Sequence, residues 1–507
     1  MKSNSRLTSP LITGTIILTI TGFLNKGIGF FYRIFLSNTI GEEGMGIYQL
    51  VFPVVGVCMA VCAFSFQTAI SRYVAAASGD NQSGQQHLIL RCGFLLTGFL
   101  SCVLAAVVYH FAVPISRYIL LEERCADLLK IVALSLPFSS LHACGCGYYY
   151  GKQKASVPAF SQVVEQVIRV LSVWIIWKVR TEQGLLLTPA GVMAGLLLSE
   201  IASDLFLFLC YFSTEKTKKY KASMLPIMKD ILYMAIPLTA NRLLLNILQS
   251  FEAIMIPSRL QLFGLTNSSA LSIYGVLTGM AMPFLFFPST LTNSAAVMLL
   301  PAVSRAQSNE QNHTIHHASN LSIRFCLWLG IFCTGVFLLF GKDMGVFIFH
   351  SELAGTYITI LCWLCPFLYL TTTIASILNG TGHTTTVFFQ NMVSVTIRLA
   401  FVVFLIPRFG IIAYLWGVLF SEFILAVLHL ITLNRESGIS CPFFQFIFVP
   451  VCFTTISGVI AQWINHTLQS QFPQLSLWIL CLCIFVMTGL FCLLTFSTMG
   501  IKKFSSQ

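Results

Sequence analysis

Long apolar runs, each of about 20 residues or more, follow one another along the chain and are separated by short polar segments. An apolar helix of this length crosses a bilayer, whereas strands of a membrane β-barrel show as alternating segments of about 10 residues. The pattern therefore predicts an all-α integral membrane protein with about 14 transmembrane helices. The expected spans are residues 11–38, 45–75, 87–113, 126–149, 157–178, 187–212, 230–257, 269–299, 319–341, 354–379, 384–406, 411–433, 443–465 and 475–497.

Two of the expected spans contain unusual residues: two prolines in the span at 269–299 and two cations in the first span. Pro283 and Pro288 should kink the span expected at 269–299, because proline lacks the donor that continues a helix. The first span contains Lys26 and Arg33 and lacks a small-residue cleavage site. We interpret it as a retained transmembrane helix rather than a signal peptide.

Composition agrees with burial in lipid. Hydrophobic residues make up 56% of the chain and charged residues 9%, against about 25% charged residues in a soluble domain. Most of the 17 cysteines lie inside apolar runs, where a thiol behaves as a small hydrophobe. Cys144-Gly-Cys146 resembles a redox or metal motif, but it stands mid-span without a second pair, so we prefer a packing role.

Loop charge predicts the orientation in the membrane. With the N-terminus inside, the inner loops and the C-terminal tail carry most of the loop lysines, notably between 214 and 229. The outer loops carry most of the loop acids, among them Glu42, Glu43, Glu122 and Glu123. Both termini are therefore expected in the cytoplasm, which requires an even number of spans.

One segment of the chain occurs twice. Each copy is expected to form an apolar helix opened by proline, a glycine turn, and a second apolar helix that carries an arginine. Flanking stretches recur in the same order at slightly different offsets, which favours a duplicated half-chain. The paired stretches are Ala69–Arg72 with Ala302–Arg305, Pro137–Leu141 with Pro366–Leu370, Gly151 with Gly380, Ile168–Arg169 with Ile397–Arg398, and Gly195–Glu200 with Gly417–Glu422.

The duplication predicts two six-helix lobes. Six spans separate the copies, so both halves face the same way and are related by an axis along the membrane normal, not by inversion. We expect the N-terminal lobe at residues 11–213, a basic cytoplasmic linker at 214–228 and the C-terminal lobe at 229–433. Two additional helices should occupy residues 443–497.

No nucleotide-binding, hydrolase or metalloprotease motif appears in the chain. We therefore predict that the protein is neither an enzyme nor an ATP-driven pump, and that it needs no cofactor. His313, His316 and His317 have a spacing that can hold a metal, but no carboxylate or cysteine cluster adjoins them. We interpret the three histidines as a solvated inner loop and predict no metal site.

A polar stripe runs along the first span. Its members recur at steps of four and three, so they share one helix face, while the other faces are Leu, Ile and Phe. The stripe consists of Thr15, Thr19, Gly22, Lys26, Gly29 and Arg33. Ionisable groups at membrane depth are costly and usually line a cavity, so Lys26 and Arg33 are expected there. The alternative is close helix packing through the glycines, with both cations snorkelling outward.

The seventh span carries a similar pair. Asn241-Arg242 mirrors Asn25-Lys26, so each lobe is expected to present an amide and a cation from its first helix. Two cationic first helices that face each other predict a cleft for an anionic substrate, opened alternately to each side by rocking of the lobes. Arg72 and Arg305 end spans at the inner surface, where they either bind phosphates or follow the positive-inside rule.

Other ionisable groups lie inside the spans. Glu165 and Arg169 are one helical turn apart and are expected to pair. Arg398, the repeat counterpart of Arg169, has no acid on its own helix and needs a partner elsewhere. All of these groups either line the cavity or form structural inter-helix pairs. The remaining candidates are Glu200, Asp204, Glu252 and Glu422.

The first third of the chain carries a family resemblance. Leu18–Ile34 (LTITGFLNKGIGFFYRI), Ile40–Leu50 (IGEEGMGIYQL), Ala69–Tyr73 and the Gly151-Lys152 turn resemble the stage V sporulation protein B family. That family belongs to the polysaccharide-transport branch of the multidrug/oligosaccharidyl-lipid/polysaccharide exporter superfamily and is related to lipid II flippases. By span count and repeat, the resemblance extends over essentially the whole chain.

The resemblance implies a flippase in a bacterial plasma membrane. Its expected substrate is an undecaprenyl-diphosphate-linked oligosaccharide or a peptidoglycan precursor, moved by alternating access. In related flippases, cations of the first helix line a central cavity, and that role carries over to Lys26 and Arg33. Expected partners are the lipid-linked saccharide, membrane lipids and cell-wall synthesis enzymes, with no nucleic acid.

Two other functions compete with this prediction. An ion-coupled multidrug or cation antiporter of the same superfamily would use membrane carboxylates such as Glu165, Glu200, Asp204 and Glu252. The cationic first helix argues against a cationic drug. A non-transporting membrane scaffold for wall synthesis is the third alternative, although a scaffold has little need for charges at the bilayer midplane.

Overall fold

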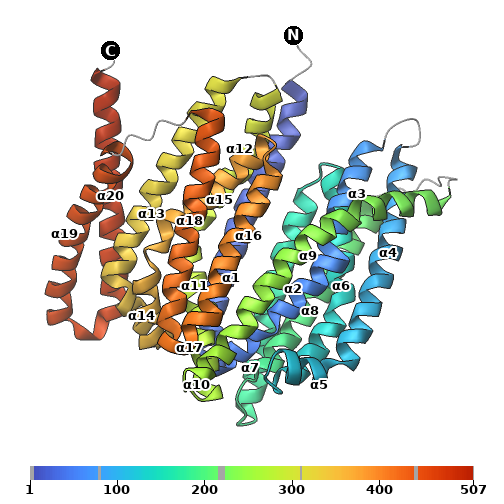
Figure 1. The fold of residues 1–507 in the computed structure, drawn as a ribbon, viewed down its shortest axis with the longest axis horizontal. Helices are drawn as coiled ribbons and strands as arrows, with labels where there is room; N and C mark the ends of the chain where they lie inside the picture. The colour runs from blue at the N-terminus through green and yellow to red at the C-terminus, as the bar shows by residue number, and fades with distance from the viewer. Residues whose placement is uncertain (1–4, 78–81, 215–222, 309–310, 439–443, 506–507) are drawn as a thin grey trace. The chain divides into compact units, whose positions relative to one another are not determined.

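The computed structural model describes residues 5–77, 82–214, 223–308, 311–438 and 444–505, which form helices joined by short connections (Figure 1). Within these residues no strand occurs, which confirms the all-α prediction. The described chain divides into two compact units, residues 1–275 and 276–507. The predicted division at 214–228 falls inside the first unit, and residues 215–222 of that linker lie outside the described residues. The lobe boundaries and the symmetry axis stay predictions.

In the first unit, α6 packs against α3, α4 and α8, while α1 packs against α7 and α10. Short π-helical segments at Ala60–Phe64 and Ile115–Ile119 continue α2 and α5. The helices are α1 (Ser5–Leu50), α2 (Phe52–Met59), α3 (Ser65–Ala76), α4 (Gln82–His110), α5 (Ala112–Pro114), α6 (Cys125–Gly151), α7 (Ser156–Glu182), α8 (Pro189–Thr214), α9 (Met224–Leu262) and α10 (Asn267–Gly275).

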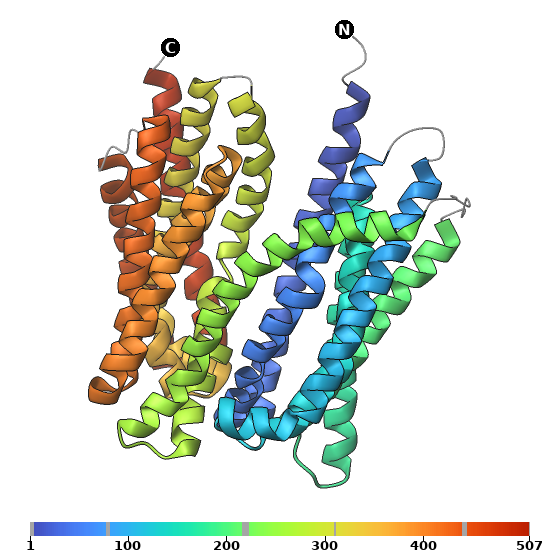
Figure 2. The same cartoon turned by 45° about the vertical axis from the view of Figure 1, so that its right-hand side comes forward.

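In the second unit, α15 packs against α12, α13 and α18, and the last two helices, α19 and α20, pack against each other and against α13 (Figure 2). Its π-helical segments are Val276–Ala281, Phe401–Leu405 and Phe444–Phe448. The helices are α11 (Met282–Phe286), α12 (Ser289–Ser308), α13 (Asn312–Phe349), α14 (Glu352–Leu361), α15 (Leu364–Gly380), α16 (Thr384–Ala400), α17 (Ile406–Phe409), α18 (Ile411–Ser437), α19 (Val449–Gln471) and α20 (Ser476–Ser505).

Twelve helical segments of the described chain are long and apolar enough to cross a membrane, or 13 when the bent pair α14 and α15 counts as one span. The first segment, Ile17–Ala76, has 60 residues. At 1.5 Å per residue this segment is about 90 Å long, about three times the thickness of the hydrocarbon core. It is therefore too long for one span and has room for the two crossings expected at 11–38 and 45–75. The break lies at Gly41, whose φ of 70° suits a residue without Cβ. With the first segment counted as two crossings, the number of candidate spans in the described chain agrees with the expected number of about 14.

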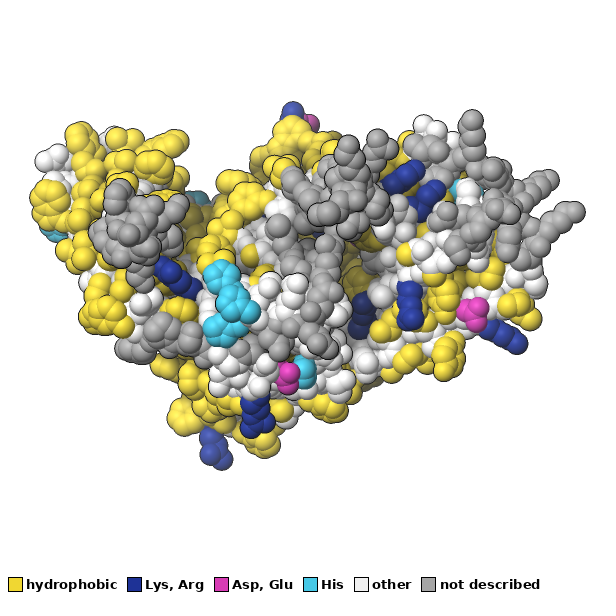
Figure 3. All heavy atoms as spheres, turned by 90° about the horizontal axis from the view of Figure 1, so that it is seen from above, with side chains coloured by type: hydrophobic (Ala, Val, Ile, Leu, Met, Phe, Trp, Pro, Cys, Tyr) yellow, Lys and Arg dark blue, Asp and Glu magenta, His cyan; other side chains and the backbone are white. Residues whose placement is uncertain are grey.

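The positions of some prolines and histidines relative to the helix ends differ from those expected. The span expected at 269–299 is interrupted at Pro288, as expected, because α11 ends at Phe286 and α12 starts at Ser289. Pro366 lies near the start of α15, but Pro137 lies inside α6, so the first copy is not opened by its proline. The three histidines expected in a loop lie in the first turns of α13. His313 and His317 are exposed there, and Figure 3 shows histidine side chains close together on the surface.

Candidate functional site

A polar cavity of about 310 Å³ lies inside the first unit. Five parts of the chain contribute to its wall: α1, the segment from α2 to α3, and the three helices α6, α7 and α8. A cavity of this size holds several water molecules when polar groups line it. Its polar side chains are Asn25, Gln67, Ser139, His142, Gln162, Glu165, Gln166 and Glu200.

Glycines bring the helices around this cavity close together. A Cβ on Gly195 of α8 would stand 2.3 Å from Cγ2 of Val173 on α7, and one on Gly147 of α6 would stand 2.6 Å from the carbonyl oxygen of Gln67. Small residues at such crossings let transmembrane helices approach backbone to backbone. The close approach at Gly195 brings α7 and α8, which carry Glu165 and Glu200, together.

The predicted pair between Glu165 and Arg169 forms, through Nη2 of the arginine and Oε1 of the glutamate. Nη2 of Arg169 also lies 3.9 Å from Oε1 of Glu200, and its Nε donates to Oγ of Ser199 at 3.3 Å. All three charged side chains are more than four-fifths buried. One guanidinium thus stands between two carboxylates, which leaves one negative charge in excess within this trio.

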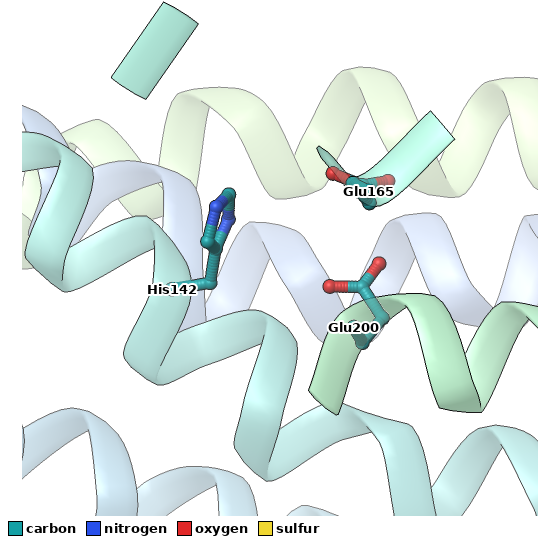
Figure 4. Close-up of side chains that lie close together, drawn as sticks. All are labelled: His142, Glu165 and Glu200. Atoms are coloured by element: carbon teal, nitrogen blue, oxygen red, sulfur yellow. The ribbon is translucent and has the colours of Figure 1, made fainter. Parts of the chain in front are cut away.

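His142 is the residue that sequence reasoning missed. Its Nε2 shares a hydrogen bond with Oγ of Ser161, and its ring points into the same space as the carboxylates of Glu165 and Glu200 (Figure 4). One ring nitrogen and one oxygen of each carboxylate all lie within 4.8 Å of one another. A histidine in the middle of a predicted span was the available signal, because ionisable groups at membrane depth are usually functional.

The predicted cationic residues of the first unit lie in three settings. Lys26 is exposed on α1, whereas Arg33 is half-buried and within electrostatic range of Tyr48 and Arg169. Arg242 on α9 donates from Nη2 to Oγ1 of Thr68 at 3.3 Å and lies over the ring of Phe64, 6.0 Å from its centroid.

The two predicted amides, Asn25 and Asn241, and the two inner-surface arginines, Arg72 and Arg305, also differ in their surroundings. Asn25 lines the cavity, and its buried Oδ1 has no hydrogen-bond partner within the described chain. Asn241 is exposed. Nη1 of the exposed Arg72 lies 3.9 Å from Sδ of Met234, and the side chain of Arg305 lies outside the described residues. The structure therefore brings Asn25 into the cavity and Arg242 to its edge at Phe64, while Lys26 and Arg33 line other faces.

The remaining predicted acids are buried. Asp204, one turn after Glu200, lines a separate narrow pocket with Tyr148 and Tyr211. Glu252 is buried on α9. In the second unit, Glu422 of α18 accepts a hydrogen bond of 2.6 Å from Oγ1 of Thr371 and lies within electrostatic range of Arg398. Glu422 is thus an acid on another helix within electrostatic range of Arg398, and a direct pair between the two stays a prediction.

A second polar network, which sequence reasoning did not identify, joins α1, the α5–α6 connection and α10. Arg124 donates to both carboxylate oxygens of Glu122, at 2.7 and 3.0 Å, and to Oε1 of Glu43 at 2.8 Å. Asn267, the first residue of α10, donates to Oε2 of Glu122 at 2.7 Å. Burial alone would raise the pKa of Glu122, but the bonds from Arg124 and Asn267 outweigh it and hold the pKa below its usual value.

Comparison with known proteins adds independent information. Residues 11–307 match a family model described as polysaccharide biosynthesis protein. Stage V sporulation protein B of Bacillus subtilis (strain 168) is 26% identical over 483 residues, which cover 92% of each chain. The lipid II flippase MurJ in an inward closed conformation matches with a TM-score of 0.68 and 13% identity, over 94% of this chain and 98% of that chain.

A second solved structure has the same fold. An inward-facing multidrug resistance MATE family transporter of the MOP superfamily matches with a TM-score of 0.64 and 14% identity, over 84% of this chain and all of that chain. At these identities, the two solved structures establish a shared fold and nothing about cargo.

Proposed function

Because the chain belongs to the polysaccharide biosynthesis protein family, we propose that it flips a saccharide linked to undecaprenyl diphosphate across a bacterial plasma membrane by alternating access. A peptidoglycan precursor belongs to the same chemical class. The flippase named among the solved structures shares the fold, which is compatible with this cargo. Both termini are cytoplasmic in this proposal, as the loop charges favour.

The observation that carries the proposal is the charge of α1. The first acid of the chain is Glu42, so the whole membrane-spanning part of α1 carries only the cations Lys26 and Arg33. Arg242 adds a third cation from α9 of the same unit. A diphosphate diester is an anion, and ammonium and guanidinium groups bind phosphate oxygens by charge-assisted hydrogen bonds. Lys26 acts as a point charge, whereas the arginines offer planar forks.

The membrane potential can drive this transport. A diphosphate diester carries about two negative charges, and each charge that crosses the membrane is worth about 2.3 kcal/mol per 100 mV. With the cell interior negative, outward movement of the headgroup gains about 4.6 kcal/mol per 100 mV, provided that the protein's own charges stay in place. No bound sodium ion or proton is required for this driving force.

The test is flipping of a fluorescent lipid-linked saccharide in proteoliposomes under an imposed potential without an ion gradient. Lys26→Ala and Arg33→Ala should each abolish flipping and leave folded protein in the membrane, whereas Lys26→Arg should keep most of the rate. Asp127→Asn, which changes an exposed carboxylate paired with Lys130, serves as the matched surface control. Full activity of Lys26→Ala, or a rate that ignores the potential, contradicts the mechanism.

The second candidate function is ion-coupled export of a cationic drug. It is favoured by the carboxylates in the cavity and by the fold shared with a multidrug transporter. The same proteoliposomes distinguish the two functions, because a drug exporter moves a cationic dye and leaves the lipid-linked sugar in place. A scaffold without transport activity moves neither.

A further inference from the structure

The cavity of the first unit contains three titratable groups that the proposed headgroup contacts do not use. They are His142 of α6, Glu165 of α7 and Glu200 of α8, and their side chains face one another (Figure 4). We propose that these three residues form a proton-binding site, in which one proton is shared between Glu200 and His142 while Glu165 is held by Arg169. The binding of the proton does not depend on which cargo the protein carries.

The spacing of the three donors would also suit a metal ion, but the chemistry of the site does not. The guanidinium of Arg169 is bonded to Glu165 and lies 3.9 Å from Glu200, so a divalent cation between the carboxylates would meet a fixed positive charge. An alkali ion is disfavoured as well, because imidazole binds zinc and other transition metals rather than alkali ions. A proton is the cation that both an imidazole and a carboxylate accept and that matches a single excess negative charge.

Glu165 and Glu200 differ in their distance from Arg169, and this difference indicates which carboxylate binds the proton. Glu165 forms the close ion pair with Arg169. Glu200 stands farther from the guanidinium, and its carboxylate faces the imidazole of His142 in the same cavity. The unpartnered Oδ1 of Asn25 in the same cavity wall offers an acceptor to water that delivers the proton.

Charged and titratable groups surround the site on each packed helix. Cys146 of α6 has its Sγ 3.8 Å from Nε2 of His142, and Asp204 follows Glu200 by one turn on α8. On α1, Tyr32, Arg33 and Tyr48 lie within electrostatic range of Arg169, and Lys26 follows Asn25 directly. The π-helical segment between α2 and α3 contributes Phe64, and α3 contributes Gln67; neither side chain titrates, and Arg242 of α9 lies over the Phe64 ring.

Protonation of this site therefore changes the charge that α1 experiences. When Glu165 and Glu200 are both deprotonated, their two negative charges offset the positive charge of Arg169 and part of that of Arg33. When the site binds one proton, the positive charges of both arginines are less compensated. This part of the proposal rests on the proposed function: the protonated protein should bind the anionic diphosphate more tightly. The attraction between one unit charge and one phosphate charge, at about 10 Å in an effective dielectric of about 20, changes affinity by roughly tenfold.

Infrared difference spectroscopy on the purified full chain tests the site itself. Acidification should produce a carbonyl band of a protonated carboxylic acid, and Glu200→Gln, which keeps the side-chain shape, should remove it. Glu165→Gln frees Arg169 for Glu200 and should move the band's titration to lower pH, whereas Asp127→Asn should leave it unchanged. If Glu200→Gln and Glu165→Gln both leave every carboxylic band in place, the proposal is wrong. One zinc ion bound per chain, lost with Glu200→Gln and without such a band, also overturns it.

Binding of undecaprenyl diphosphate to the protein in detergent tests the coupling. Affinity of the natural chain should rise about tenfold as the pH falls through the titration of the site, and Glu200→Gln should hold the high affinity at every pH. Binding without pH dependence overturns the coupling. Absence of binding at any pH overturns the proposed function, and the infrared band still decides whether the proton site exists.

Discussion

Arg169 carries the only guanidinium within salt-bridge distance of the two described cavity carboxylates. Arg169→Leu removes the positive charge and leaves Glu165 and Glu200 facing each other in a buried site. We expect a loss of about 3–5 kcal/mol of unfolding free energy, the usual cost of an uncompensated buried charge. Arg169→Lys should lose less, because an ammonium keeps the charge without the fork. Thermal unfolding in detergent measures both, with Lys130→Leu on the surface as control; a similar effect of Arg169→Leu and this control would contradict the assignment.

Glu122 gives the protein a pH-dependent contact outside the membrane spans. Its folded-state pKa is lowered, so the network contributes stability above the usual glutamate pKa of about 4.3 and loses it as the pH falls through the folded value. Glu122→Gln should lower the unfolding temperature at neutral pH, and the difference from the natural chain should vanish in acid. A difference that stays constant from pH 7 to below the folded pKa would show that the contact is steric.

At the scale of the helix, the crossing of α7 and α8 depends on Gly195. A methyl group there would stand 2.3 Å from Cγ2 of Val173, so Gly195→Ala should cost about 1–3 kcal/mol by overpacking. Val173→Ala in the same chain removes the opposing methyl groups and should recover part of this loss. Gly27→Ala, where a Cβ meets nothing within 4 Å, is the matched control. Unfolding temperatures of the four chains check the prediction, which fails if the double variant is no more stable than Gly195→Ala.

At the scale of the whole molecule, orientation is the property to test. We expect Lys218→Cys and Ser505→Cys to react with a membrane-impermeant maleimide only after cells are permeabilised, because both positions should be cytoplasmic. Cys102, Cys481 and Cys492 are exposed in the described structure and should first be replaced by serine to remove background. Labelling of either position in intact cells would contradict the arrangement of spans.

The sequence by itself determined the class of the protein, its spans and its family. Apolar runs long enough to cross a bilayer leave the backbone no other solution than helices, so the span ranges follow from local composition. The family expected from the sequence is confirmed by the match of residues 11–307 to the family model described as polysaccharide biosynthesis protein. The pair of Glu165 with Arg169 was also predictable, because residues four apart on one helix face each other.

Only the tertiary structure decided which distant residues share a cavity. His142, Glu165 and Glu200 come from three helices, and their meeting depends on close crossings at glycines rather than on any spacing along the chain. The same holds for Glu122, which meets Glu43 through Arg124 and Asn267 through a hydrogen bond from a later helix. Local sequence fixes helices through backbone hydrogen bonding, whereas the contacts between helices depend on side-chain packing across the whole unit.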